Sequence, residues 1–263
     1  NENNYLEFPG SFRVIEFKNV SFKYPSADKY SLKNVNLKIE DQKAYALVGE
    51  NGSGKTTLIK LLMRLYDPTE GEILIDGINI KEYSKESIYK KIGVIFQDYI
   101  KYPLDVQANI GIGFVEEIEN WNRMLRASEK SKADIFISQL PQKYHSFLNK
   151  EYDEGMELSI GQWQKIAISR AYMNEDAAIL ILDEPSAALD PKAEYEMFHD
   201  FKQLTPNKAS ILITHRFSNV KLADKIFVMR DGELIEEGTH DQLISINSVY
   251  RELYNMQAES YIL

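Results

Sequence analysis

The sequence contains no cysteine, which excludes disulfide bonds, thiol catalysis and thiolate metal sites. It has only four histidines, and their separations do not match the spacing of metal ligands. No apolar run approaches the roughly 20 residues that a membrane-spanning helix needs, and no secretory signal opens the chain. The longest apolar runs, such as Ala177–Leu182, have the length of strands.

The chain also has a deficit of positive charge, with 31 Lys and Arg against 40 Asp and Glu and a net charge of −9. Because nucleic-acid binding needs clustered cations to replace counterions, a nucleic-acid partner is disfavoured. A phosphate-bearing ligand is not excluded, since backbone N–H groups and a single Lys can hold one. With 263 residues, of which 44% are hydrophobic, the chain can bury a substantial core in one large or two small domains.

The hydrophobic pattern predicts an α/β fold. Alternation at Val14–Phe22 and Leu32–Ile39 indicates half-buried strands of an antiparallel sheet, and a helical pattern after Tyr45–Val48 stops before Asp67. Ser84–Lys91 and much of the region from 105 to 140 are predicted to be helical. Further strands are predicted at Ile73–Ile75, Gly93–Phe96, Ile179–Leu182, Ser210–Thr214 and Lys225–Met229.

The order of these elements predicts a parallel sheet with a helical insertion, because each late strand is followed by a helix-like stretch. The insertion is expected around residues 98–165. Residues 1–10 are polar and end in Pro9-Gly10, so we interpret them as a linker. The first residue is Asn rather than Met, and we therefore expect the chain to be a fragment of a longer protein.

Residues 49–56 read G-E-N-G-S-G-K-T, which fits the phosphate-loop pattern G-x-x-x-x-G-K-[ST] between a predicted strand and a predicted helix. The glycines let backbone N–H groups point at phosphate oxygens near a helix N-terminus. Lys55 adds a positive charge for the β- and γ-phosphates, and the Thr56 hydroxyl is short enough to reach Mg²⁺. By itself the loop indicates a nucleoside triphosphate without separating kinases, GTPases, helicases and transporters. The predicted binding residues are Gly49, Asn51, Gly52, Ser53, Gly54, Lys55, Thr56 and Thr57.

Polar side chains end two of the late strands. The strand Ile179–Leu182 runs into Asp183 and Glu184, which point to opposite faces and should have different roles. Asp183 can hold Mg²⁺ or its water, and Glu184 can accept a proton from an attacking water. His215 follows the strand at 210–214, where a contact with the γ-phosphate is expected.

Residues 158–162 read L-S-I-G-Q, which resembles the signature of ATP-binding cassette proteins, usually L-S-G-G-Q. Other elements of this family are recognisable in the same order. Tyr24 resembles the aromatic residue that stacks on adenine, and Gln97 resembles the glutamine that contacts Mg²⁺ and relays to the membrane part. Asp190 closes Ser186–Asp190, which resembles the loop that crosses to the partner subunit. The implied catalytic residues are Glu184, His215, Gln97 and Asp190, and the implied metal ligands are Thr56, Gln97 and Asp183.

This resemblance implies a P-loop NTPase (RecA-like) core with an antiparallel β-subdomain and an inserted α-helical subdomain at about 98–170. The nucleotide-binding domain would cover residues 11–263. Two domains, expected to form a homodimer, would bind ATP and Mg²⁺ head to tail. Each ATP would then lie between the phosphate loop of one chain and the signature residues Ser159, Gly161 and Gln162 of the other.

The signature departs from the usual pattern at Ile160. A β-branched residue is costly at positive φ, so we expect negative φ here and a working but slowed site. The signature helix should begin near Gly161. Trp163 is expected to form one wall of that helix together with Ile166, Ala167 and Ala171.

Several segments resemble exporters, and the region Lys150–Lys165 is most similar to bacterial peptide or lantibiotic exporters. The acidic segment Glu151–Gly155 resembles a loop that contacts coupling helices, although a solvated turn explains it equally well. The segment from Ile235 to His240 and the tail Tyr250–Gln257 also resemble exporters. The transmembrane domain would precede this chain and place it at the cytoplasmic face of the membrane.

Three alternatives stay open at this level. The chain could be the separately encoded ATPase subunit of an importer. It could instead be a soluble cassette ATPase acting on DNA or ribosomes, which its acidic charge and lack of a long coiled-coil insertion disfavour. A regulatory module that binds nucleotide without hydrolysis is disfavoured by Glu184 and His215.

Overall fold

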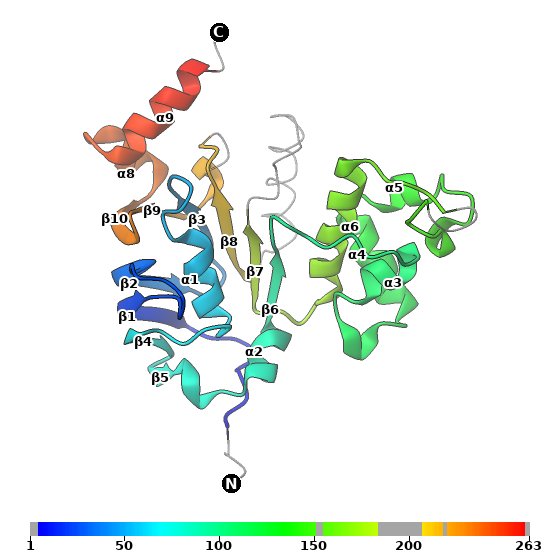
Figure 1. Cartoon of the computed structure of the whole chain (residues 1–263), viewed down its shortest axis with the longest axis horizontal. Coiled ribbons are helices and arrows are strands. Elements are labelled where there is room, and N and C mark those ends of the chain that lie inside the picture. Colours follow the sequence, from blue (N-terminus) through cyan, green and yellow to red (C-terminus); the bar gives the residue numbers. More distant parts are fainter. Residues whose placement is uncertain (1–4, 151–154, 184–206, 218–219, 261–263) are drawn as a thin grey trace.

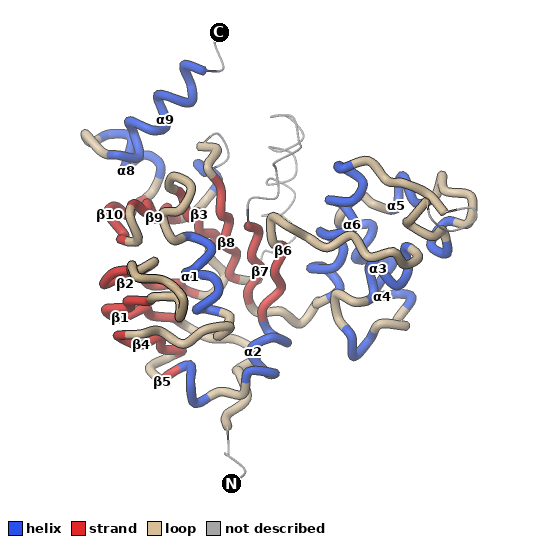
Figure 2. Tube along the Cα trace, viewed as in Figure 1, coloured by secondary structure: helices blue, strands red, loops and turns tan. Residues whose placement is uncertain are grey.

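The computed structural model describes residues 5–150, 155–183, 207–217 and 220–260. This part of the chain contains two sheets, helices that pack on them and a separate group of helices, as Figures 1 and 2 show. None of its helices is both long enough and apolar enough to cross a membrane.

The first sheet is antiparallel and has the strand order β2-β1-β4-β5. Its strands are β1 (Val14–Phe22), β2 (Leu32–Glu40), β4 (Glu70–Ile75) and β5 (Ile78–Asn79). Ile15 of β1 pairs with Ile39 on one side and Ile75 on the other, and all three are buried. The apolar positions of the alternating strands therefore form one continuous buried face.

The second sheet has six strands in the order β10-β9-β3-β8-β7-β6. Its strands are β3 (Ala44–Val48), β6 (Ile92–Ile95), β7 (Ile179–Asp183), β8 (Ala209–Thr214), β9 (Lys225–Arg230) and β10 (Glu233–Gly238). Strands β3, β6, β7, β8 and β9 pair with one another in parallel. The expectation that a helix follows each late strand is wrong for β9, because the turn at Asp231-Gly232 leads directly into the antiparallel strand β10.

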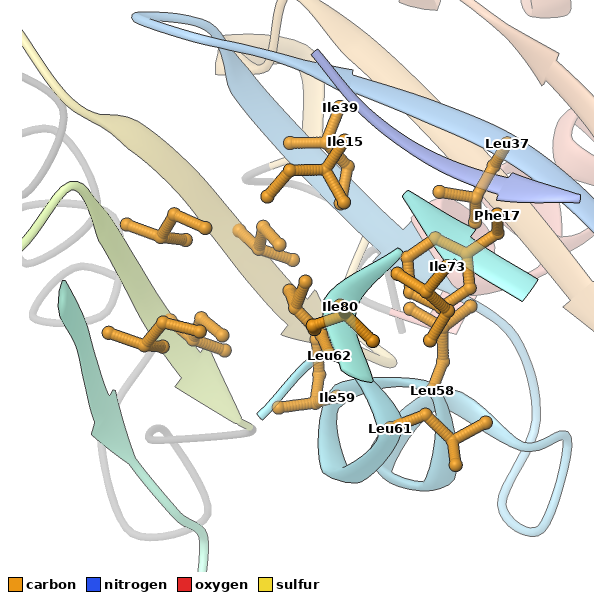
Figure 3. Close-up of a cluster of buried hydrophobic side chains, with 14 of the residues drawn as sticks. Ile15, Phe17, Leu37, Ile39, Leu58, Ile59, Leu61, Leu62, Ile73 and Ile80 are labelled. Carbon is orange, nitrogen blue, oxygen red and sulfur yellow. The ribbon is translucent and has the colours of Figure 1, made fainter. Parts of the chain in front are cut away.

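Helix α1 (Lys55–Leu62) lies between the two sheets. Its buried residues Leu58, Ile59, Leu61 and Leu62 pack in one cluster with the inner face of the antiparallel sheet, including Phe17 (Figure 3). Each such side chain contributes about 1.5–3 kcal/mol when it is removed from water. This packing fixes the first turn of α1, and therefore the loop before it, against both sheets.

A helical part is inserted between β6 and β7 and has its own core (Figure 1). Its helices are α3 (Val106–Gly111), α4 (Trp121–Lys130), α5 (Asp134–Ile137) and α6 (Ile160–Met173). Short 3₁₀ turns occur at Ile80–Glu82, Val115–Glu117, Lys143–His145 and Val220–Leu222. Trp163, Ile166, Ala167 and Ala171 are all buried along α6, as predicted.

The two ends of the described chain pack on the core. Before β6, α2 (Lys85–Lys91) receives the N-terminal segment, in which Phe8 is buried and its N–H donates to Ser87 Oγ at 2.9 Å. The segment interpreted as a linker is therefore docked on the domain from Tyr5 onward. At the other end, α8 (His240–Ser245) and α9 (Val249–Ser260) cover a third cluster that includes Val48 and Tyr250.

Candidate functional site

The carboxyl ends of neighbouring parallel strands meet at one edge of the six-stranded sheet. The register aligns Val48 of β3 with Thr214 of β8, and β8 also pairs with the end of β7 at Asp183. The loop after β3, the carboxylate of Asp183 and His215 after β8 are therefore neighbours. Gln97 follows the end of β6, the strand beside β7, and is exposed. Ligands of open α/β sheets bind at this edge.

The loop of residues 49–54 follows a backbone path that glycine alone accommodates at two points. Gly49 has a φ of 151°, and a Cβ there would lie 2.2 Å from Met229 O. Gly54 has a φ of 103°, and a Cβ there would lie 2.8 Å from Ser31 O. Gly54 is also the N-cap residue of α1 and makes no side-chain capping bond. Uncapped N–H groups at a helix N-terminus attract anions, which fits a phosphate group.

Lys55 and Thr56, the first two residues of α1, turn their side chains toward this loop and strand edge. Lys55 is 5% exposed, and its Nζ donates to Gly49 O at 2.8 Å and to Glu50 O at 3.0 Å. Thr56 Oγ1 donates to Asp183 Oδ2 at 2.9 Å, although 127 residues separate them in the sequence. The structure thus joins the two motifs predicted separately, and gathers an ammonium, a hydroxyl and a buried carboxylate at one place.

The other predicted loop residues differ in burial. Asn51 and Gly52 are exposed, whereas Ser53 and Thr57 are buried. Thr57 Oγ1 lies 3.2 Å from the hydroxyl of Tyr24, the residue predicted to stack on adenine. The loop and the aromatic residue are therefore adjacent.

Tyr24 belongs to a small aromatic group beside the phosphate loop. The Tyr24 ring lies edge-on to Phe22 at 4.9 Å and to Tyr66 at 5.2 Å, measured between ring centroids. Lys60 Nζ lies 5.8 Å from the centroid of the Tyr24 ring. Tyr24 is only partly buried, so an aromatic surface is available next to the loop.

The signature residues lie on a different element, at the start of α6. Ser159 is the N-cap, and its Oγ accepts from Gln162 N at 3.3 Å while Gln162 Oε1 accepts from Ser159 N at 2.9 Å. This capping box satisfies two N–H groups that a helix start leaves unpaired. Gly161 is the second residue of the helix, and a Cβ there would meet no atom of the described residues within 4 Å. Helix α6 packs on α3, α4 and β6, and Figure 1 shows it beyond β6 and β7 from α1.

Ile160 begins α6, so its φ is negative, as predicted. Its side chain is 58% exposed at the tip of the helix. Its carbonyl accepts a hydrogen bond from Tyr99 OH at 3.3 Å, and Tyr99 lies two residues after Gln97. The segment after β6 is thus connected to the signature by a contact that the sequence did not indicate.

Arg170 is a second connection that sequence reasoning missed. Its guanidinium donates to Ile100 O at 2.7 Å and to Asn109 O at 2.8 Å, and it lies over the Tyr102 ring at 5.1 Å. Burial lowers the pKa of Arg170 to about 10, which leaves it charged at neutral pH. One signal was present, since Arg170 interrupts the apolar face of the predicted signature helix. It joins α6 to the segment that follows Gln97.

Some predicted residues lie outside the described part of the chain. They are Glu184, Asp190 with its segment from Ser186, and residues 151–154 of the acidic segment before the signature. Their predicted roles stay predictions. The described residues bring together the phosphate loop, Tyr24, Asp183 and the strand that carries His215, and they place the signature apart from these groups.

Comparison with known proteins identifies the family of this chain. The family model described as "ABC transporter" matches residues 32–187. The chain is 43% identical over 248 residues to the subtilin transport ATP-binding protein SpaT of Bacillus subtilis, covering 94% of this chain and 40% of that protein. It is 40% identical over 245 residues to the nisin transport ATP-binding protein NisT of Lactococcus lactis subsp. lactis, covering 93% of this chain and 40% of that protein.

A solved structure of a bacterial Atm1-family ABC exporter with ATP bound superimposes with a TM-score of 0.88 and 30% identity. The match covers 97% of this chain and 43% of that one. The chain therefore belongs to the ABC transporter family, and it is an ATP-binding and ATP-hydrolysing domain of that family. It spans well under half the length of these relatives.

Proposed function

We propose that this domain hydrolyses ATP as one half of a head-to-tail homodimer and powers export of a substrate across a membrane. The observation that carries the dimer is the separation of the two halves of the site. The phosphate loop lies at the start of α1, while the signature lies on α6 beyond β6 and β7. Two copies related by a two-fold axis would place each signature over the other's phosphate loop.

Gly161 supports this assignment. Among the residues that the structure describes, nothing crowds the position where its Cβ would lie, so no contact with them requires glycine there. A glycine at an uncrowded helix N-terminus leaves room for a group from outside to reach the backbone N–H. The γ-phosphate held by the partner's loop is such a group, because anions are attracted to helix N-termini. Ser159 and Gln162 would stand on either side of it.

Within one chain, Lys55 would move from the carbonyls of Gly49 and Glu50 to the β- and γ-phosphates, exchanging neutral acceptors for charged ones. Tyr24 would stack on the adenine. Glu184 would accept the proton of the attacking water, and His215 would hold the γ-phosphate. Asp190 would act at the crossing to the partner.

The donor set at the end of β7 fits Mg²⁺, because hydroxyl and carboxylate oxygens are the ligands this ion prefers. Thr56 and Asp183 already lie within hydrogen-bond distance of each other, and Gln97 follows the neighbouring strand. These three residues would hold the ion, which would neutralise charge on the β- and γ-phosphates.

A groove of about 820 Å³ supports a partner for this domain. It lies between β6, α2 and the helical part, next to the segment that follows Gln97. Its lining includes Tyr89, Ile100 and Val115, which are 41%, 60% and 66% exposed. We assign this groove to an amphipathic segment of the transmembrane domain, which would place the chain on the cytoplasmic face of a membrane.

The groove has its own test in the complete transporter. Replacing exposed Ile100 by Glu should uncouple transport from hydrolysis, because a charge would be buried in the docked segment, while the isolated chain should keep its turnover. Transport that stays coupled in this variant would rule the groove out as the docking site.

The relatives named for subtilin and nisin transport make a peptide our choice of exported substrate.

The shared site is tested by measuring the specific ATPase activity of the chain across a range of protein concentrations with Mg²⁺, beside Glu184→Gln. Specific activity should rise with concentration and then level off, because each site needs two chains. It should vanish in Glu184→Gln while ATP binding remains. Activity that is independent of concentration, from a chain that stays monomeric, would contradict the proposal.

A further inference from the structure

One amide side chain of the C-terminal helix makes hydrogen bonds to the backbone at two points, the carbonyl of His215 and the N–H of Phe217. Gln257 of α9 accepts a hydrogen bond from Phe217 N at 2.8 Å through Oε1. Its Nε2 donates to the carbonyl oxygen of His215. Because one rigid amide group makes both bonds, it fixes the distance and angle between the two peptide groups.

The same segment is also held from the side of the sheet. Arg216 N donates to Thr214 Oγ1 at 2.9 Å, and Thr214 is 1% exposed at the end of β8. Phe217 is buried and lies edge-on to Tyr250 at 5.4 Å between ring centroids. The His215 side chain is exposed at the strand edge between these two attachments. The backbone that carries the His215 side chain is therefore held from two sides.

Helix α9 is in turn anchored to the sheet near its first turn. The carboxylate of Glu236 on β10 accepts from Val249 N at 2.7 Å and from Tyr250 N at 3.0 Å. A carboxylate at a helix N-terminus stabilises both the N–H groups and the helix dipole. His240 Nδ1 also lies 2.7 Å from Tyr250 OH. Gln257, two turns further along α9, therefore projects from a fixed support.

We propose that Gln257 is a positioning residue that holds the backbone of His215 so that its side chain reaches the γ-phosphate. The inference rests on the proposed role of His215. It adds that the C-terminal helix, to which the sequence assigns no part in the catalytic site, takes part in setting the geometry of hydrolysis.

The test replaces Gln257 by Met, which has a similar length and makes neither hydrogen bond. We expect kcat to fall by about tenfold, because a shift of about 1 Å in a reacting group can cost up to about 100-fold. The KM for ATP should change by less than about twofold, since the binding groups stay in place. Met256→Ala is the matched control, because Met256 is the adjacent residue on α9 and is 61% exposed. It should match the wild type.

Hydrogen exchange of the Phe217 amide supplies a readout independent of activity. In Gln257→Met this amide should exchange faster, while the melting temperature stays within about 2 °C of the wild type. A loss of kcat of the expected size while the Phe217 amide exchanges at the wild-type rate would overturn the proposal. An unchanged kcat would overturn it as well. If the KM for ATP rises by the same factor as kcat falls, Gln257 has a general structural role, and that result would also overturn the proposal.

The variant His215→Ala separates this inference from the proposed function. Suppose that His215→Ala lowers turnover and that the double variant His215→Ala/Gln257→Met has the same residual turnover as His215→Ala alone. Gln257 then acts through His215. If His215→Ala retains full turnover, the role of His215 is wrong, and that of Gln257 with it. If His215→Ala is inactive and Gln257→Met is fully active, only the assignment of Gln257 is wrong.

Discussion

Replacing Gly161 by Ala should make the chain more stable and less active at the same time. Gly161 is the second residue of α6, and an added Cβ meets nothing within 4 Å. No contact with the described part of the chain therefore opposes the methyl group. The only predicted cost falls on the partner's nucleotide, which would approach this N–H group in the dimer.

The two magnitudes follow from separate terms. Ala is preferred over Gly in a helix by about 0.5–1 kcal/mol, and the position in the first turn favours the lower end of that range. For a chain of this size, about 0.5 kcal/mol raises the melting temperature by about 1–2 °C. Displacing the γ-phosphate from a preorganised N–H donor should lower kcat by about 10- to 100-fold.

Thermal unfolding tests the predicted gain in stability, and steady-state ATPase measurements on the same preparation test the predicted loss of activity. ATP binding to the single chain should be unchanged, because the phosphate loop is untouched. Full activity in Gly161→Ala would refute the reasoning, since it would mean that no group from outside approaches this glycine. A loss of stability would show that the space seen at this position is filled in the folded chain.

Three further predictions concern crowding, the signature and pH. Gly113→Ala would place a Cβ 2.1 Å from Arg170 O and should destabilise the chain by about 2–3 kcal/mol, and a normal denaturant midpoint would show that the segment gives way easily. Ile160→Gly should raise ATP turnover by a few fold and cost about 0.5–1 kcal/mol in α6, and unchanged turnover would mean that Ile160 does not limit the site. Burial lowers the pKa of Lys208 from 10.5 to about 8, so the unfolded chain binds more protons between these values and the stability of the folded chain rises with pH. The wild type should therefore gain stability relative to Lys208→Met between about pH 7 and pH 10, and a difference that is the same at both pH values would contradict this cause.

The parts of the fold that the sequence predicts are those with local patterns. The strand Val14–Phe22 alternates because one face is buried, and its predicted bounds match β1. Strand β10 was missed for the opposite reason. Its residues, Glu233–Gly238, alternate only between exposed and half-buried positions, as on a charged edge strand, and three of the six are Glu.

The candidate site divides in the same way. The phosphate loop and the strand ending at Asp183 are each contiguous, so their residue types reveal them. The contacts that join elements are not visible in a single sequence. Arg170 and Ile100 are 70 positions apart, and Gln257 and His215 are 42 positions apart. Such pairs form only after the sheet and helices have packed.

Mixing two inactive variants tests the shared site most directly. Lys55→Ala removes the phosphate contact, and Gly161→Asp places a carboxylate where the partner's γ-phosphate would lie. Each variant alone should be inactive. In a mixed dimer, the intact phosphate loop of one chain would meet the intact signature of the other. An equimolar mixture should regain about one quarter of the wild-type activity, because about half of the dimers are mixed and each keeps one of two sites. A mixture as inactive as its separate components would contradict a site built from two chains.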